Sequence, residues 1–383
     1  MIILMLAASC KTDRPSPFAD GGANDNYQHY MSDYRASPYK WGYIDTNGKL
    51  VIKNKYDDCR DFSEGLAAVN LDGLWTYIDR TGKVLMPPRY RTAQRYSEGI
   101  GVVRTFEDTY LLYSTTGEAI SDTLYYDEVG PYYSGRARVK QGDYYGYINS
   151  AGQQLDSLTY RKASHYQDGY AIVEGIGGPT LIDDTGSSVL PTGTSTSKVH
   201  IPREGVVRLK SEAGFRYYDL QRSQWIGSTY ARGTDFQLQY ALVHDTRSYH
   251  LMDKTGKLTR LPYEKVVIGG EGKWIYRQGQ NYGYLNNDGS VLTLPNHDTA
   301  TRFRSGMAAV EHDGQWGYID SLGTLAIDYQ FPLAWDFVGD RARSINREGF
   351  SFIDKNGDYI ISPYYIEVRD FADGLARVQI YRQ

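Results

Sequence analysis

The sequence predicts an all-β protein of about ten tandem units of roughly 34 residues, each a three-stranded antiparallel meander. Three observations support this fold class. A glycine-centred turn motif recurs at spacings of 33 to 36 residues between Gly48 and Gly357. A second motif, Phe-Ser-Glu-Gly-Leu-Ala-Ala-Val at 62–69, recurs in phase with the first. The 36 tyrosines and 40 glycines are the balance expected of short twisted strands joined by tight turns.

The turn motif is clearest in the string Trp-Gly-Tyr-Ile-Asp, which occurs identically at 41–45 and 316–320. In nine of ten units an aromatic residue stands seven positions before the anchor glycine, and Asp or Asn stands three before it. Agreement at a fixed period is the signature of a repeat architecture. The anchors are Gly48, Gly82, Gly117, Gly152, Gly186, Arg222, Gly256, Gly289, Gly323 and Gly357.

One unit illustrates the predicted strands. Residues 65–69 form a first strand, residues 74–79 a second, and residues 83–86 a third. The Asp-x-x-Gly segment at 79–82 suits a hairpin turn, because Asp can accept backbone amides and Gly tolerates positive φ. A loop of about ten residues then returns to the next unit.

Alternation along 41–45 places apolar groups on both faces of the sheet, so each sheet needs a covering neighbour on either side. The first unit begins at Trp41 without a preceding strand, and the last ends with a strand at 374–380. Pairing of these two segments would complete the deficient unit and remove exposed edges. We therefore favour a propeller-like closed toroid, with two smaller rings or an open curved β-repeat array as alternatives.

The two phased motifs together resemble the bacterial WG (tryptophan–glycine) repeat family. The resemblance covers nearly all of residues 39–380, although the glycine after the aromatic residue occurs only at Gly42, Gly146, Gly283 and Gly317. It implies a β-repeat fold and no particular activity.

The N-terminus carries a separate signal. An apolar run with Ala7, Ala8 and Ser9 before Cys10 resembles the lipobox of bacterial lipoprotein signal peptides, although a basic n-region is missing. The run is too short to span a bilayer. We predict a signal peptide at 1–9, a lipidated Cys10 with a flexible tether over 10–38, and repeats over 39–190 and 191–383, or one continuous repeat domain over 39–383. Residues 187–205 have the weakest register and are the best boundary.

Several classes of chemistry find little support. A net charge of −4 argues against nucleic-acid binding, and metalloprotease, phosphate-loop, nucleophile-elbow and Cys-x-x-Cys motifs are missing. The recurring acids could form a carboxylate ring, but their periodicity favours a structural role in the loops. We predict no catalytic residue, no metal ion and no cofactor. The recurring acids are Glu64, Glu98, Asp168, Glu204 and Asp373.

Aromatic residues that break the period are the better candidates for facing a ligand, because an exposed ring can stack on a sugar or anchor a peptide. Aromatic residues that keep the period after the third strand, including Tyr125, are expected to pack. The ligand-facing candidates are Tyr126, Tyr133, Tyr144, Trp225, Trp274 and Trp335.

The sequence thus favours a non-catalytic lipoprotein of the bacterial cell envelope, at the outer membrane on its periplasmic or surface face. It would act as a repeat-built scaffold that binds an unknown protein or glycan. The alternative is a carbohydrate-binding module or a carbohydrate-active enzyme on a propeller-like rim.

Overall fold

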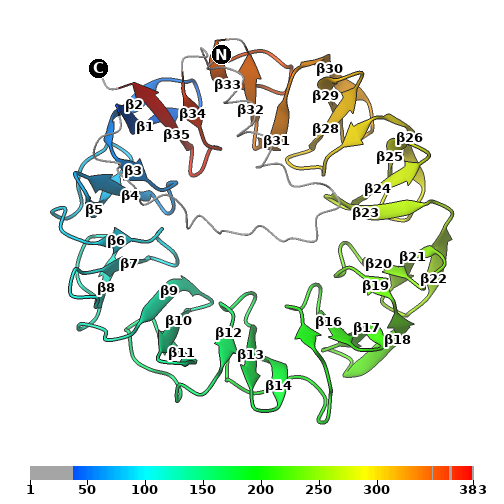
Figure 1. Ribbon diagram of the computed structural model, residues 1–383, viewed down its shortest axis with the longest axis horizontal. Helices are drawn as coiled ribbons and strands as arrows, with labels where there is room; N and C mark the ends of the chain where they lie inside the picture. Colours follow the sequence, from blue (N-terminus) through cyan, green and yellow to red (C-terminus); the bar gives the residue numbers. More distant parts are fainter. Residues whose placement is uncertain (1–37, 347, 362–364, 382–383) are drawn as a thin grey trace.

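The structure is a computed structural model that describes residues 38–346, 348–361 and 365–381. These residues form 35 strands in ten antiparallel sheets of three or four strands. The sheets follow chain order around a ring (Figure 1). The described part of the chain has no helix long and apolar enough to span a membrane. The predicted all-β repeat architecture is confirmed.

Five sheets have three strands and five have four. The three-stranded sheets are β3 (Asp58–Cys59), β4 (Leu66–Leu71) and β5 (Leu74–Asp79); β6 (Thr92–Ala93), β7 (Ile100–Arg104) and β8 (Tyr110–Ser114); β9 (Glu128–Tyr133), β10 (Arg136–Gln141) and β11 (Tyr144–Asn149); β12 (Lys162–Ala163), β13 (Ala171–Gly175) and β14 (Gly178–Ile182); and β31 (Ala334–Val338), β32 (Arg341–Asn346) and β33 (Gly349–Ile353).

The four-stranded sheets are β15 (Lys198–Val199), β16 (Val206–Ser211), β17 (Gly214–Asp219) and β18 (Gln224–Tyr230); β19 (Arg232–Gly233), β20 (Tyr240–His244), β21 (Tyr249–Asp253) and β22 (Leu258–Leu261); β23 (Lys265–Gly270), β24 (Lys273–Gln278), β25 (Asn281–Leu285) and β26 (Val291–His297); β27 (Thr299–Ala300), β28 (Met307–His312), β29 (Gln315–Asp320) and β30 (Leu325–Phe331); and β2 (Leu50–Tyr56), β1 (Tyr39–Asp45), β35 (Leu375–Tyr381) and β34 (Glu367–Val368).

The first two predicted strands pair as a hairpin in nine sheets of the described chain, and in the tenth they come from its two ends. The predicted third strand is present in the five four-stranded sheets, as β2, β18, β22, β26 and β30. The three-stranded sheets differ from expectation. In the sheet β3–β5, β4 pairs with β5 as predicted. The predicted return loop contributes an additional short strand, β3, which pairs with β4. The predicted third strand at 83–86 is reduced to isolated bridges, including Ile78↔Val84. The prolines Pro87 and Pro88 that follow cannot donate to a ladder, which accounts for the irregular outer edge.

The first and last described strands lie side by side in one sheet. β1 pairs with β35 over seven residues, from Tyr39↔Tyr381 to Asp45↔Leu375. The pairing expected between these two segments is therefore present, and the tenth sheet contains strands from both ends of the described chain (Figure 1).

Hydrophobic clusters lie between neighbouring sheets, because each sheet is apolar on both faces. Ten such clusters occur in the described chain, one at each junction of two sheets. In one of them the large Tyr43 of β1 packs with the small Ala67 of β4. The same pairing of a tyrosine with an alanine recurs for Tyr147 with Ala171. Large and small residues thus alternate across the junctions, as close packing requires.

A buried tyrosine hydroxyl fixes the distance between many neighbouring sheets. Tyr77 in β5 donates to the carbonyl oxygen of Gln94 at 2.8 Å, beyond the short strand β6 of the next sheet. Its acceptor lies 17 residues further along the chain. The tyrosines that stand two residues before the Asp or Asn of the turn motif and make this bond at the same offset are Tyr43, Tyr77, Tyr147, Tyr217, Tyr284 and Tyr318.

Arginine–aspartate pairs join some sheets near the inner strands. Arg377, Arg208 and Arg343 each reach an aspartate of the next sheet, at N–O distances of 2.5, 2.7 and 2.7 Å. The partners are Asp61, Asp235 and Asp370.

Asp336 stands at the equivalent position of its own sheet, but the residue that would supply the arginine is Ala309. Within the described residues the Asp336 carboxyl has no ion pair closer than 4.0 Å. Its burial raises its pKa, although Arg304 opposes this shift.

Removing the tyrosine hydroxyl should weaken the contact between sheets. We expect Tyr77→Phe to lower the free energy of unfolding by about 1–2 kcal/mol, because the part-buried Gln94 carbonyl loses its donor. Urea denaturation measures this difference. Tyr144→Phe is the matched control, since Tyr144 is 47% exposed and should tolerate the same change. Equal stability of Tyr77→Phe and wild type would contradict a role for the bond.

Neutralising Asp336 should stabilise the protein at neutral pH. A carboxyl group whose pKa is raised on folding destabilises the folded protein when it is charged. The destabilisation begins near pH 3.9, the pKa of an unfolded Asp, and grows until the pH exceeds the folded pKa. We expect Asp336→Asn to unfold at a higher temperature than wild type at pH 7, with the difference vanishing near pH 3. The control is Asp370→Asn, which removes the partner of Arg343 and should destabilise. A less stable Asp336→Asn would show that the charged carboxylate makes a favourable contact.

Candidate functional site

Three of the predicted ligand-facing residues lie on or beside one sheet without forming a site. Tyr133 ends β9 and is 42% exposed, whereas Tyr144 begins β11. The register Arg136↔Tyr133 and Gln141↔Tyr144 puts these two tyrosines at opposite ends of the sheet. Tyr126 is half-buried, and its hydroxyl reaches Gln154 at 3.4 Å.

The prediction for Trp274 is wrong, because this side chain is fully buried. Its Nε1 donates to the carbonyl oxygen of Asn287 at 3.1 Å. Trp274 occupies the strand position that Ala67 holds in its own unit, and the residue across the junction is Leu251 in place of a tyrosine. The large residue of the pair is therefore Trp274 and the smaller one is Leu251, the reverse of Ala67 and Tyr43, and Trp274 belongs to the core.

Trp335 is predicted to face a ligand and Tyr125 to pack in the core, and both are placed differently from a simple surface or core residue. Trp335 is half-buried and contacts Phe350 at a ring distance of 6.0 Å. Tyr125 is expected from the period to pack in the core, but it is 72% exposed. The neighbouring Leu124, and not Tyr125, forms the β-bridge with Tyr110.

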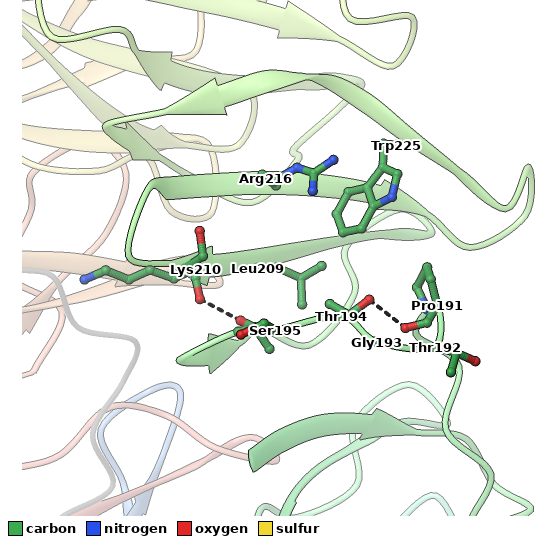
Figure 2. Close-up of a pocket in the computed structure, with 11 residues that line it drawn as sticks. Pro191, Thr192, Gly193, Thr194, Ser195, Leu209, Lys210, Arg216 and Trp225 are labelled. Atoms are coloured by element: carbon green, nitrogen blue, oxygen red, sulfur yellow. Dashed lines mark hydrogen bonds between the residues drawn. The ribbon is translucent and has the colours of Figure 1, made fainter. Parts of the chain in front are cut away.

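Trp225 lines a pocket at the outer part of the sheet β15–β18. Its ring lies 3.8 Å from the guanidinium carbon of Arg216 and 5.2 Å from the ring of Tyr218. Figure 2 shows Arg216 and Trp225 on one side of the pocket and the loop from Pro191 on the other. The pocket has a volume of about 380 Å³. The sequence indicated Trp225 but not Arg216, which becomes its neighbour only through the pairing of β17 with β18.

The opposite wall is the hydroxyl-rich loop 191–196, which interrupts the repeat register at the boundary predicted from the sequence. The Thr194 hydroxyl donates to the carbonyl oxygen of Pro191 at 2.6 Å. The Thr196 hydroxyl donates to the carbonyl oxygen of Lys210 at 2.6 Å and so joins the loop to β16. These two bonds give the wall a defined shape.

The recurring acids form a chain of turn contacts. Glu64 accepts the amides of Glu98 and Gly99, both at 2.7 Å, and Glu98 accepts the amides of Ser134 and Gly135 in turn. Asp373, in the turn before β35, likewise accepts the amide of Gly65 at 2.7 Å, in the turn before β4 of the next sheet. Each of these acids has φ near +50°, and its carboxylate reaches the next turn.

The other predicted acids, Asp168 and Glu204, belong to the same chain of contacts. Asp168 pairs with Arg203 at 3.1 Å, and Glu204 accepts the amide of Gln239 at 3.0 Å. The structural role predicted for the periodic acids therefore fits their contacts. In the following unit Leu238 stands at the position of the acid, and its side chain has no oxygen to accept the amides of the next turn. A second pocket of about 690 Å³ lies beside Leu238.

Asp298, His312 and Asp313 are the described residues whose ligand atoms approach closely enough to hold a metal ion. All three are exposed, with His312 nitrogens 3.9 Å from Asp298 and 3.7 Å from Asp313. Asp298 also accepts the amide of Asp313 at 2.9 Å, as Asp57 does for Asp72 in an earlier unit. Within this cluster the Asp298 carboxylate therefore closes a turn.

Cys59, the described cysteine, is buried in β3. Burial raises the pKa of its thiol to about 12, against the lowering effect of the nearby Arg377 guanidinium. A thiol of this kind remains protonated at neutral pH and is a poor nucleophile.

Comparisons with solved structures give low similarities. A structure described as the eukaryotic initiation factor has a TM-score of 0.48 and 11% identity over 78% of this chain and 95% of its own. BamB from Moraxella catarrhalis has a TM-score of 0.32 and 10% identity, over 90% of this chain and 98% of its own. PorZ, a surface component of the type-IX secretion system of Porphyromonas gingivalis, has a TM-score of 0.27 and 12% identity, over 84% of this chain and 53% of its own. These TM-scores are too low to carry an argument.

No curated protein matches the chain. The family model of the WG containing repeat matches seven segments, at residues 41–75, 75–105, 114–145, 145–178, 282–316, 316–343 and 350–381. These segments include both phased motifs and cover more than half of the chain. The protein therefore belongs to the WG-repeat family.

Proposed function

We propose that this protein is a non-catalytic lipoprotein of the cell envelope whose repeat-built surface binds a protein or a glycan. A propeller-like β-scaffold of this kind is consistent with an interaction or binding role. One observation carries the proposal. The recurring polar groups bond to the framework, whereas the pocket at Trp225 lies where the repeat pattern fails. Its Arg216 has no acidic partner among the residues that the structure describes.

The composition of this pocket favours binding over hydrolysis. Its lining residues include Arg216 and Lys210 but no Asp or Glu. Glycosidases generally place two carboxyl groups beside the scissile bond. A carbohydrate-binding module is therefore the second candidate, and the half-buried Trp225 is the observation that favours it.

The envelope location rests on the sequence around Cys10, which lies outside the described residues. A diacylglycerol on this cysteine would hold the ring close to a membrane, because two acyl chains anchor far more firmly than one. The polar segment after Cys10 would separate the ring from the membrane surface.

Removal of the acyl acceptor tests the anchor. We expect wild type to incorporate labelled fatty acid and to sediment with membranes, and Cys10→Ala to do neither. Cys59→Ala is the control, since that thiol is buried and should leave labelling unchanged. Membrane association that persists in Cys10→Ala, together with unlabelled wild type, would refute the lipoprotein assignment.

Incubation of the full chain with cell-wall and host glycans tests the absence of catalysis. We expect retention of a glycan or protein partner without release of new reducing ends. Bond cleavage that disappears on substitution of a single Asp or Glu would instead establish the carbohydrate-active enzyme.

A further inference from the structure

We propose that the pocket between Arg216, Trp225 and the loop 191–196 binds an acidic sugar, with the Arg216 guanidinium holding the sugar carboxylate. The inference rests on the proposed binding function and names the ligand class. It depends on the charge of the pocket, the stack of Arg216 on the Trp225 ring and the hydroxyl groups of the facing loop.

Arg216 differs from the other arginines that stack on tryptophan. Arg60 over Trp75 has a carboxylate within 3.5 Å, and Arg343 over Trp335 has one within 2.7 Å. Arg216 makes the closest stack, at 3.8 Å, yet no carboxylate within the described chain pairs with it. Its charge is therefore available to a ligand.

The pocket is cationic, and the position of the cation is restricted. Lys210 is the other charged lining residue, and Figure 2 shows its side chain extending away from the pocket. Because Arg216 lies against the Trp225 ring, the edge of its planar guanidinium remains free to donate. Such an edge matches the two oxygens of a carboxylate.

The facing wall suits the rest of a sugar. Within the described residues, the hydroxyls of Thr192 and Ser195 have no hydrogen-bond partner, whereas those of Thr194 and Thr196 hold the loop in place. Free hydroxyls can both donate to and accept from sugar hydroxyls. The volume of about 380 Å³ lies in the range of small-molecule sites.

Isothermal titration of the full chain in detergent tests this assignment. Trigalacturonate is the probe, its methyl ester is the neutral control, and inorganic phosphate tests for a plain anion site. We expect trigalacturonate to bind at least tenfold more tightly than either control. Equal affinity for the ester would refute the carboxylate contact, and equal affinity for phosphate would refute recognition of a sugar.

Arg216→Gln should weaken trigalacturonate binding at least tenfold. The matched control is Arg60→Gln, which alters another tryptophan-stacked arginine and should leave binding unchanged. Circular dichroism of both variants checks that the fold is retained. Unchanged binding by a folded Arg216→Gln would overturn the inference, as would failure of wild type to bind trigalacturonate. If either occurs while the protein still retains another envelope glycan or protein, the scaffold function stands and only the ligand class is wrong.

Discussion

Every sheet in this protein is apolar on both faces, and the rest of the structure depends on that constraint. A sheet of three or four short strands with two such faces is unstable in water, so each needs a neighbour on either side. The clusters between sheets meet this need, with Tyr43 against Ala67 as the usual pattern. A buried tyrosine ring also brings a hydroxyl that requires an acceptor. The acceptor 17 residues later lies in the next sheet, so the same side chain supplies packing and alignment.

Features that depend on local sequence could be predicted well. The Asp-x-x-Gly turns and the hairpins follow from residues a few positions apart, and a shared period indicates that they recur. The short inner strand β3 could not be predicted in the same way, because its two residues pair only when β4 is already in place. The irregular edge after β5 depends on prolines beyond the predicted strand.

The candidate site shows a different limit. A departure from the period predicts a functional residue, and this prediction has a different outcome for each of two tryptophans. Trp274 breaks the period because its volume is exchanged with that of Leu251 across a junction, which single-chain spacing cannot reveal. Trp225 breaks it beside an irregular loop, where the framework leaves a hollow. Sequence spacing does not indicate Arg216, because the register of the sheet brings it to Trp225.

The pairing of β35 with β1 has a consequence for how the protein is made. A chain that emerges N-terminus first presents β1 long before its partner strand exists. Until Leu375 and the residues after it are available, β1 retains an open edge and the adjoining apolar face lacks part of its cover. An interrupted chain would therefore expose a surface prone to association with other strands, which chaperones and proteases could distinguish from the finished ring.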